Sequence, residues 1–203
     1  MINVNSYVAG NWIEPDSTAQ SIRSAVTGDV IARAGCERLD TQSMLYAARE
    51  NAGPALRDMT FHDRAKRLKA LATLLNDNKE ALTELSFNTG ATRADSVIDI
   101  DGGIGTAFVF ASKARRELPD DHVLMDGDTE QLSRNGTFLG QHIYTSKRGV
   151  AVQINAFNFP VWGMLEKLAP ALLAGVPSII KPATVSSYAV SYTHLTLPTK
   201  RIV

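Results

Sequence analysis

Cysteine is almost absent from this sequence: Cys36 is the single one among 203 residues. One thiol excludes an internal disulfide and is typical of a reducing compartment. Long apolar runs are also missing, since none approaches the roughly 18 to 20 residues that cross a bilayer. Residues 1–5 lack the basic and then apolar pattern of a signal peptide. We therefore expect a cytoplasmic protein with no membrane partner.

An excess of charge of either sign is missing too. Twenty-one Lys and Arg residues balance 21 Asp and Glu residues, so no net field favours nucleic acid. The four histidines are scattered without metal-ligand spacing, and Cys36 has no histidine near it in the sequence, so we expect no metal site and a spectator thiol. With 44% hydrophobic and 21% charged residues, the composition is that of a globular protein of one large or two small domains.

Residues 149–183 have the clearest pattern in the chain. A short β-branched apolar run precedes apolar residues at three- and four-residue spacing, which end at Gly175, and a second apolar run follows. This order predicts a strand, a helix and a strand, most simply a right-handed βαβ unit of a parallel sheet. Ligands of open parallel sheets bind beyond the carboxyl ends of the strands. The candidate crevice therefore lies across residues 155–160 and 181–184.

The chain before residue 119 is predicted to be mainly helical. Residues 6–14 indicate a β-hairpin with its turn at Gly10-Asn11, and residues 30–34 a strand near it. Helices are expected over about 40–56, 60–75, 78–88 and 93–116, the first of them broken or kinked at Gly53-Pro54. The last of these carries apolar residues at Val97, Ile98, Ile104, Phe108, Val109 and Ala111.

A glycine cluster within the last of these helices, residues 101–105, has two interpretations. Gly103-Ile104-Gly105 is similar to part of a dinucleotide-binding loop, but Phe108 stands where the third glycine should be and no strand precedes the cluster. We therefore predict that these glycines serve close helix packing.

Residues 119–148 are polar and rich in turn signals. Asp126-Gly127-Asp128 and Asn135-Gly136 separate short possible strands such as residues 141–145. A segment of this kind has few apolar residues to bury by itself, so we predict a hairpin arm that packs on a neighbouring domain or subunit.

Two motifs in the candidate crevice, AFNFP at 156–160 and IIKPA at 179–183, resemble the aldehyde dehydrogenase superfamily. That family has a Pro-Trp-Asn-Phe-Pro loop and, one helix and one strand later, a lysine; Ala156 and Phe157 depart from the pattern but keep the loop apolar. Residues 89–96, 101–106, 116–121 and 162–170 are similar to the branch in which such a domain is fused to a MaoC-like hydratase in phenylacetate degradation. The resemblance implies an α/β fold, the N-terminal part of the aldehyde dehydrogenase fold, with a helical N-terminal region and the first βαβ unit of a Rossmann-like parallel sheet.

The resemblance implies roles for two residues. The side-chain amide of Asn158, with a backbone N–H, would hold the oxyanion that forms when a thiolate attacks the aldehyde; alternatively, Asn158 only caps the following helix. Lys181 would hydrogen-bond the adenosine ribose of the dinucleotide; alternatively, it is a solvated loop lysine.

The dinucleotide is expected to contact both loops of the crevice. The residues implied are Ile154, Asn155, Ala156, Phe157, Lys181, Pro182, Ala183 and Thr184, with Ile154 and Phe157 on the nicotinamide side. NAD-preferring relatives commonly have glutamate at the position of Thr184, where it repels a 2′-phosphate, so the neutral Thr184 favours NADP, with NAD possible. Alternatively, Thr184 only caps the next helix.

The same resemblance implies that the catalytic cysteine and glutamate lie downstream of Lys181, outside this sequence. We therefore expect residues 1–203 to be an N-terminal fragment that is inactive alone. The expected regions are 1–118, the hairpin and helical part of the cofactor-binding domain; 119–148, an arm for oligomerisation; 149–187, the first βαβ unit; and 188–203, a tail without a helical stripe or family resemblance, interpreted as an artefact of sequence assembly.

The predicted function of the complete protein is NADP-dependent oxidation of a CoA-linked semialdehyde to the acid in phenylacetate degradation. Its partners would be the small-molecule aldehyde and further copies of itself, in a homo-oligomer. The alternatives are the semialdehyde dehydrogenase of benzoyl-CoA breakdown and a nucleotide-binding α/β module without catalysis.

Overall fold

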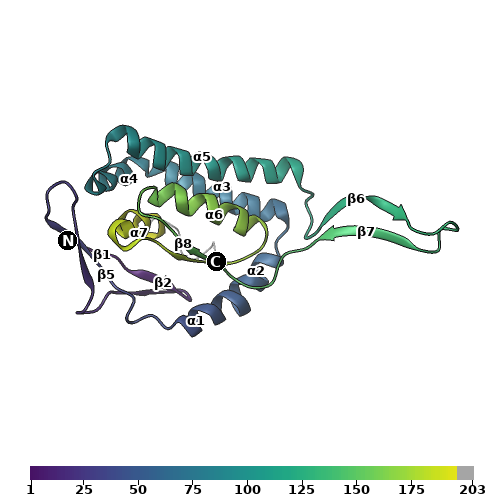
Figure 1. Ribbon diagram of the computed structural model, residues 1–203, viewed down its shortest axis with the longest axis horizontal. Helices are drawn as coiled ribbons and strands as arrows, with labels where there is room; N and C mark the ends of the chain where they lie inside the picture. The colour runs from purple at the N-terminus through teal and green to yellow at the C-terminus, as the bar shows by residue number, and fades with distance from the viewer. Residues whose placement is uncertain (196–203) are drawn as a thin grey trace.

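The computed structural model describes residues 1–195. Three helices, α3 (Phe61–Asp77), α5 (Arg93–Glu117) and α6 (Pro160–Leu173), pack together at the centre of the molecule, and a long hairpin extends away from them (Figure 1). Helices and short sheets together form the α/β architecture predicted from the sequence. None of the described helices is long and apolar enough to span a membrane.

Five short strands form two small N-terminal sheets: β1 (Ile2–Asn3), β2 (Ser6–Val8), β3 (Asn11–Ile13), β4 (Gln20–Arg23) and β5 (Val30–Ala34). β2 and β3 make the predicted hairpin, but its turn is Ala9-Gly10, one residue earlier than predicted. Both turn residues have positive φ, of 48° and 84°, which suits the right-handed twist of the two strands. β5 pairs with β1 and β4 and not with this hairpin.

The first helical segment continues through Gly53-Pro54 without a break. It consists of α1 (Thr41–Tyr46), a π-helical turn η1 (Ala47–Ala52) and α2 (Gly53–Arg57). Proline lacks an N–H and its ring crowds the carbonyl four residues earlier. The wider π turn, in which the Gly53 N–H donates to the carbonyl of Ala48, gives the ring room. The predicted kink is therefore replaced by a change of helix type.

Local capping signals determine the ends of the next three helices. The Thr60 hydroxyl accepts from the Asp63 N–H at the start of α3, and Thr92 and Asp95 form a capping box at the start of α5. Between them, α4 (Lys79–Ser86) continues into a 3₁₀ turn, η2 (Phe87–Thr89), which ends at Gly90 with a φ of 87°. These positions confirm the sequence-based boundaries to within a few residues.

The glycine cluster of α5 lies inside the helix, at its contact with α6. A Cβ on Gly103 would come within 2.8 Å of the Trp162 Cα, and a Cβ on Gly102 within 2.8 Å of the Trp162 ring. The prediction of close helix packing is confirmed. The apolar stripe predicted for this helix is only partly buried, because Val97, Ile98 and Val109 are exposed.

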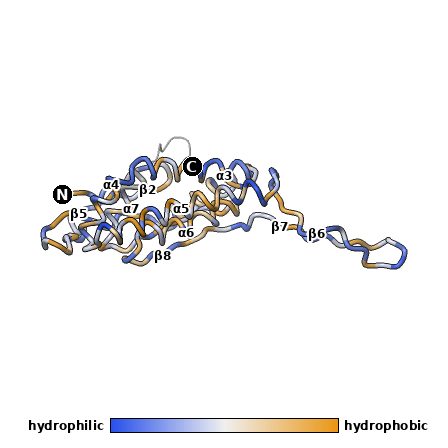
Figure 2. Tube along the Cα trace, turned by 90° about the horizontal axis from the view of Figure 1, so that it is seen from above, coloured by the Kyte–Doolittle hydropathy of each residue, from blue (hydrophilic) through white to orange (hydrophobic). Residues whose placement is uncertain are grey.

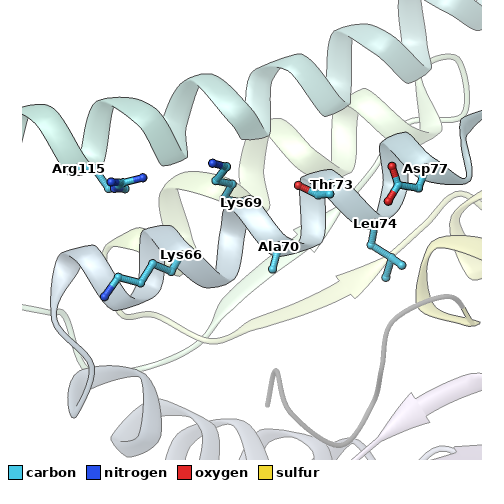
Figure 3. Close-up of a pocket in the computed structure, with 7 residues that line it drawn as sticks. All are labelled: Lys66, Lys69, Ala70, Thr73, Leu74, Asp77 and Arg115. Atoms are coloured by element: carbon cyan, nitrogen blue, oxygen red, sulfur yellow. The ribbon is translucent and has the colours of Figure 1, made fainter.

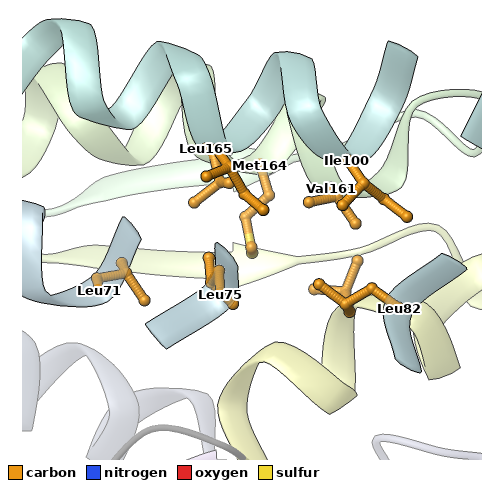
Figure 4. Packing of buried hydrophobic residues seen from close by; sticks show 9 residues of the cluster. Leu71, Leu75, Leu82, Ile100, Val161, Met164 and Leu165 are labelled. Carbon is orange, nitrogen blue, oxygen red and sulfur yellow. The ribbon is translucent and has the colours of Figure 1, made fainter. Parts of the chain in front are cut away.

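The main core lies between the α5–α6 layer and the α3–α4 layer. In Figure 4, Ile100 of α5 and Val161, Met164 and Leu165 of α6 lie opposite leucines of α3 and α4. The buried members are Leu71, Leu75, Leu82, Ile100, Ile104, Val161, Met164, Leu165 and Val190. The helical part of residues 1–118 therefore shares one core with the predicted βαβ unit.

A hairpin lies within residues 119–148. β6 (Leu124–Gln131) and β7 (Leu139–Tyr144) pair antiparallel and project far from the helices (Figures 1 and 2). Gly136 lies in the connecting turn with a φ of 70°, as its turn signal indicates. The other signal, Asp126-Gly127-Asp128, is not a turn: it lies inside β6, where the register shifts between Asp126 and Glu130, as in a β-bulge.

The last part of the chain begins with the predicted βαβ unit. β8 (Ala151–Ile154) and β9 (Ser178–Lys181) pair in parallel on either side of α6 in the sequence. α6 ends near Gly175, whose φ of 72° is readily adopted only by a residue without a side chain.

A helix, α7 (Ser187–Leu195), follows where the sequence predicted none. Tyr188 and Ala189 pack on the N-terminal strands, whereas Val190 belongs to the main core. A helix buried against two groups of elements needs no one-sided apolar stripe, which is why its periodicity is weak. The prediction of a tail without a helix is therefore wrong up to Leu195; residues 196–203 lie outside the described part of the chain.

Candidate functional site

The parallel pairing of β8 and β9 brings the two sequence motifs to one edge of the sheet. Ile154 is in register with Lys181, and the Asn155 N–H donates to the Lys181 carbonyl at 3.1 Å. The loop after β8 and the loop after β9 therefore begin side by side. This is the edge at which ligands of parallel sheets bind.

Five of the nine predicted site residues present exposed side chains at this edge. Ile154 is 76% exposed and Phe157 64% exposed, and Ala156, Asn158 and Lys181 are exposed too. Large apolar side chains exposed at a strand end mark an interaction surface. Pro182, Ala183 and Thr184 are partly buried behind them.

Asn155 is the one buried residue among the predicted site residues. Successive residues of a strand point to opposite faces, and Asn155 and Gln153 are only 6% and 5% exposed. Neither polar atom of the Asn155 side chain has a hydrogen-bond partner among the described residues. A ligand on the exposed face beside Ile154 would therefore meet the backbone of Asn155 and not its amide.

Asn158 does not cap the helix that follows it. The N-cap residue of α6 is Phe159, which makes no side-chain cap hydrogen bond, and Pro160 has no N–H to satisfy. The next two N–H groups, of Val161 and Trp162, donate to the two carboxylate oxygens of Asp99 at 3.3 and 2.8 Å. The capping alternative for Asn158 is therefore absent from the structure, and its side chain is exposed.

Asp99 was not recognised in the sequence. It is 62 residues before Val161 in the chain and 4% exposed, so nothing local to α6 indicates it. Burial raises the pKa of this carboxyl group, whereas the N–H groups of Trp162 and Val161 act in the opposite direction. Because a carboxylate already occupies the first turn of α6, this helix end is closed to the phosphate binding seen in many βαβ units.

The loop after β9 leads directly into a 3₁₀ turn, η3 (Thr184–Ser186), and then α7. The cap position of that turn is Ala183, with no side-chain cap hydrogen bond, and the Ser187 hydroxyl donates to the Thr184 carbonyl at 2.8 Å. The backbone of Thr184 therefore takes part in the turn, but its hydroxyl does not cap it.

Cys36 and the histidines His62 and His122 lie outside the two loops that follow β8 and β9. Cys36 is a free, exposed thiol in the loop after β5. A ring nitrogen of His62 is 2.9 Å from the Leu118 carbonyl, and one of His122 is 3.0 Å from the Arg57 carbonyl, so both rings join chain segments. Within residues 1–195, no group of three or more His, Cys, Asp or Glu residues could hold a metal ion.

A surface groove of about 600 Å³ lies away from these loops, along α3 (Figure 3). Its lining residues are Lys66, Lys69, Ala70, Thr73, Leu74, Asp77 and Arg115. The Lys66 ammonium is already 2.9 Å from the Asp63 carboxylate. The groove contains none of the predicted site residues, so its size alone does not make it the functional centre.

The family model of the aldehyde dehydrogenase family matches residues 12–196. It extends past residue 187, where we expected the family resemblance to end. The 3,4-dehydroadipyl-CoA semialdehyde dehydrogenase of Aromatoleum evansii is 40% identical over 184 residues, which are 90% of this chain and 36% of the relative. The D-glyceraldehyde dehydrogenase (NADP(+)) of Picrophilus torridus is 27% identical over 181 residues, 88% of this chain and 34% of the relative.

Solved structures have the same fold over the described part of the chain. The structure of 3,6-anhydro-L-galactose dehydrogenase in complex with NAP is 25% identical, with a TM-score of 0.77, and the match covers 94% of this chain and 38% of that one. The chain thus spans little more than a third of the length of the proteins that it matches.

Proposed function

This chain belongs to the aldehyde dehydrogenase family, and from this premise we propose that it forms part of an enzyme that oxidises a CoA-linked semialdehyde to the acid. In the net reaction, the aldehyde and water yield the acid, and a hydride passes to the nicotinamide of NADP with release of a proton. In this proposal Asn158 stabilises the oxyanion of the thiolate adduct, and Lys181 holds the adenosine ribose.

One observation supports the proposal most: the pairing of β8 with β9 places the Asn158 loop and Lys181 at the same strand ends. A dinucleotide that spans this edge could have its ribose at Lys181 and its nicotinamide beside Ile154 and Phe157. Asn158, which is exposed and is not used as a helix cap, would then be available to the aldehyde.

The substrate class is proposed from the Aromatoleum evansii relative, whose name includes a CoA-linked semialdehyde. Within aromatic catabolism we propose a role in phenylacetate degradation, and the competing proposal is the semialdehyde dehydrogenase of benzoyl-CoA breakdown. A non-catalytic nucleotide-binding module would use the same crevice but would lack the thiolate chemistry.

The exposed apolar residues of the arm support the further expectation of a homo-oligomer. They are Met125, Leu132, Phe138, Leu139, Ile143 and Tyr144. An extended hairpin with this many exposed large side chains has little to cover them within residues 1–195, so we propose that it packs on another copy of the protein.

An activity assay with the complete enzyme tests this function. We expect aldehyde-dependent reduction of NADP with a CoA-linked semialdehyde, and a markedly lower kcat/KM with the free semialdehyde. Residues 1–203 alone should give no such reduction, because the only thiol in them is the spectator Cys36. Tight NADP binding without turnover of any semialdehyde would instead favour the binding module.

The preference for NADP is proposed to depend on Thr184. Because Thr184 is neutral, it places no carboxylate beside Lys181. The Lys181 ammonium can then donate a charge-assisted hydrogen bond to a 2′-phosphate. Such a bond is worth roughly 1.5 to 3 kcal/mol, or about one to two decades in affinity. Thr184→Glu should reduce the ratio of kcat/KM for NADP over NAD by about 10- to 100-fold through repulsion of the phosphate. Thr184→Ser, which keeps the hydroxyl, is the matched control. An unchanged ratio in the glutamate variant would exclude Thr184 as the determinant.

A further inference from the structure

We propose that Asp99 is a positioning residue for Asn158: it holds the first turn of α6 and thereby sets the place of the preceding loop in the crevice. The inference rests on the proposed role of Asn158. It adds a buried carboxylate, contributed by another helix, to the residues on which turnover depends.

The loop that carries Asn158 is held mainly at its two ends. At the first end, the Asn155 N–H donates to the Lys181 carbonyl at 3.1 Å. At the second end, the N–H groups of Val161 and Trp162 donate to Asp99. The residues between these ends, 156–159, are all exposed, so few side-chain contacts constrain them and the anchored ends determine where Asn158 lies.

The Asp99 anchor is rigid because its surroundings are closely packed. Its neighbour Ile100 belongs to the main core, and the absence of side chains at Gly102 and Gly103 lets α5 approach the backbone of Trp162. The Trp162 ring in turn meets the Phe159 ring edge-on, with centroids 6.1 Å apart. A shift of the first turn of α6 would therefore disturb the contacts of Trp162 with α5 and with Phe159.

The chemistry of this anchor requires a carboxylate. Two N–H groups of α6 converge on it, and each carboxylate oxygen accepts one of them. Negative charge is also favourable at a helix N-terminus. Asparagine has nearly the same shape but only one acceptor oxygen, so Asp99→Asn turns a donor NH₂ group toward one of the two N–H groups and breaks that bond.

The first experiment measures the anchor directly in the complete enzyme. In Asp99→Asn, we expect one of the two amide hydrogens, of Val161 or of Trp162, to exchange about tenfold or more faster, corresponding to the one lost hydrogen bond. We expect kcat to fall by roughly 10- to 100-fold, as a misplacement of the order of 1 Å does elsewhere, with the Kd for NADP nearly unchanged.

Ser96→Ala is the matched control. Ser96 lies one turn earlier on α5, is fully buried and donates to the Ser86 hydroxyl at 3.0 Å, but it makes no contact with α6 among its hydrogen bonds. Its loss should lower stability without lowering kcat. If Ser96→Ala lowers kcat as much as Asp99→Asn does, the effect of Asp99 is a general loss of stability and the inference is wrong.

A double-mutant cycle with Asn158→Ala separates this inference from the proposed function. If Asp99 acts through Asn158, kcat of the double variant equals that of Asn158→Ala alone. Fully additive effects, or a normal kcat in Asp99→Asn, would overturn the role of Asp99 and leave that of Asn158 intact. A normal kcat in Asn158→Ala would overturn both.

Discussion

Replacement of Asn158 by alanine should lower the turnover of the complete enzyme by about 10²- to 10³-fold, the usual cost of one oxyanion donor, or about 3 to 4 kcal/mol. The amide is expected to donate to an oxygen that carries full negative charge only after the thiolate has attacked. Its contribution therefore appears in kcat and not in the ground-state affinity for the dinucleotide. The Kd for NADP should hardly change.

The structure also predicts that this substitution leaves the fold intact. Asn158 is exposed, and α6 begins at Pro160 with its first N–H groups, of Val161 and Trp162, satisfied by Asp99. The free energy of unfolding should therefore stay within about 0.5 kcal/mol of the parent. Asn158→Asp, which has the same shape but no donor, should be at least as impaired as the alanine variant. Near-normal turnover in Asn158→Ala would exclude the oxyanion role.

Replacement of Arg64 by alanine should lower the free energy of unfolding by about 3 to 5 kcal/mol, since a hydrogen bond to a charged group contributes roughly 1.5 to 3 kcal/mol. The side chain is fully buried and donates to the carbonyls of Leu56, Met59 and Leu173 at 2.7 to 2.9 Å. These carbonyls lie at or near the ends of α2 and α6, where the last turn of a helix leaves acceptors without partners. The guanidinium also lies 4.7 Å from the centroid of the Phe61 ring.

Two further variants show where this stability comes from. Arg64→Met keeps most of the volume but none of the donors, so it should recover the packing contribution and still leave the carbonyls of Met59 and Leu173 without this donor. Lys69→Ala, at an exposed position of the same helix, should change the free energy of unfolding by less than about 0.5 kcal/mol. Urea unfolding followed by circular dichroism measures all three. Equal stability of the parent and Arg64→Ala would show that these carbonyls find other partners.

Several elements could be predicted because the residues that determine them are close together in the sequence. Thr60 and Thr92 cap the helices that begin beside them, and Gly90 ends one through its own positive φ. The βαβ unit is similar: its strands, helix and final glycine form one continuous pattern. From that pattern alone the sequence placed Asn158 and Lys181 at neighbouring strand ends, since parallel strands joined by one helix bring their carboxyl ends to the same edge.

Other features depend on residues that are far apart in the chain, and no local pattern contains them. The capping of α6 by Asp99, the contact of Gly103 with Trp162 and the three bonds of Arg64 exist only once the helices have packed. Tertiary packing also decided that α7 forms although its apolar periodicity is weak. It likewise left Val97 and Ile98 exposed, although both belong to the apolar pattern predicted for α5. Helix caps and strand periods are properties of a few consecutive residues, whereas burial and remote hydrogen bonds are properties of the assembled layers. The sequence alone therefore determined which loops meet at the crevice, and only the tertiary structure decided what holds the Asn158 loop in place.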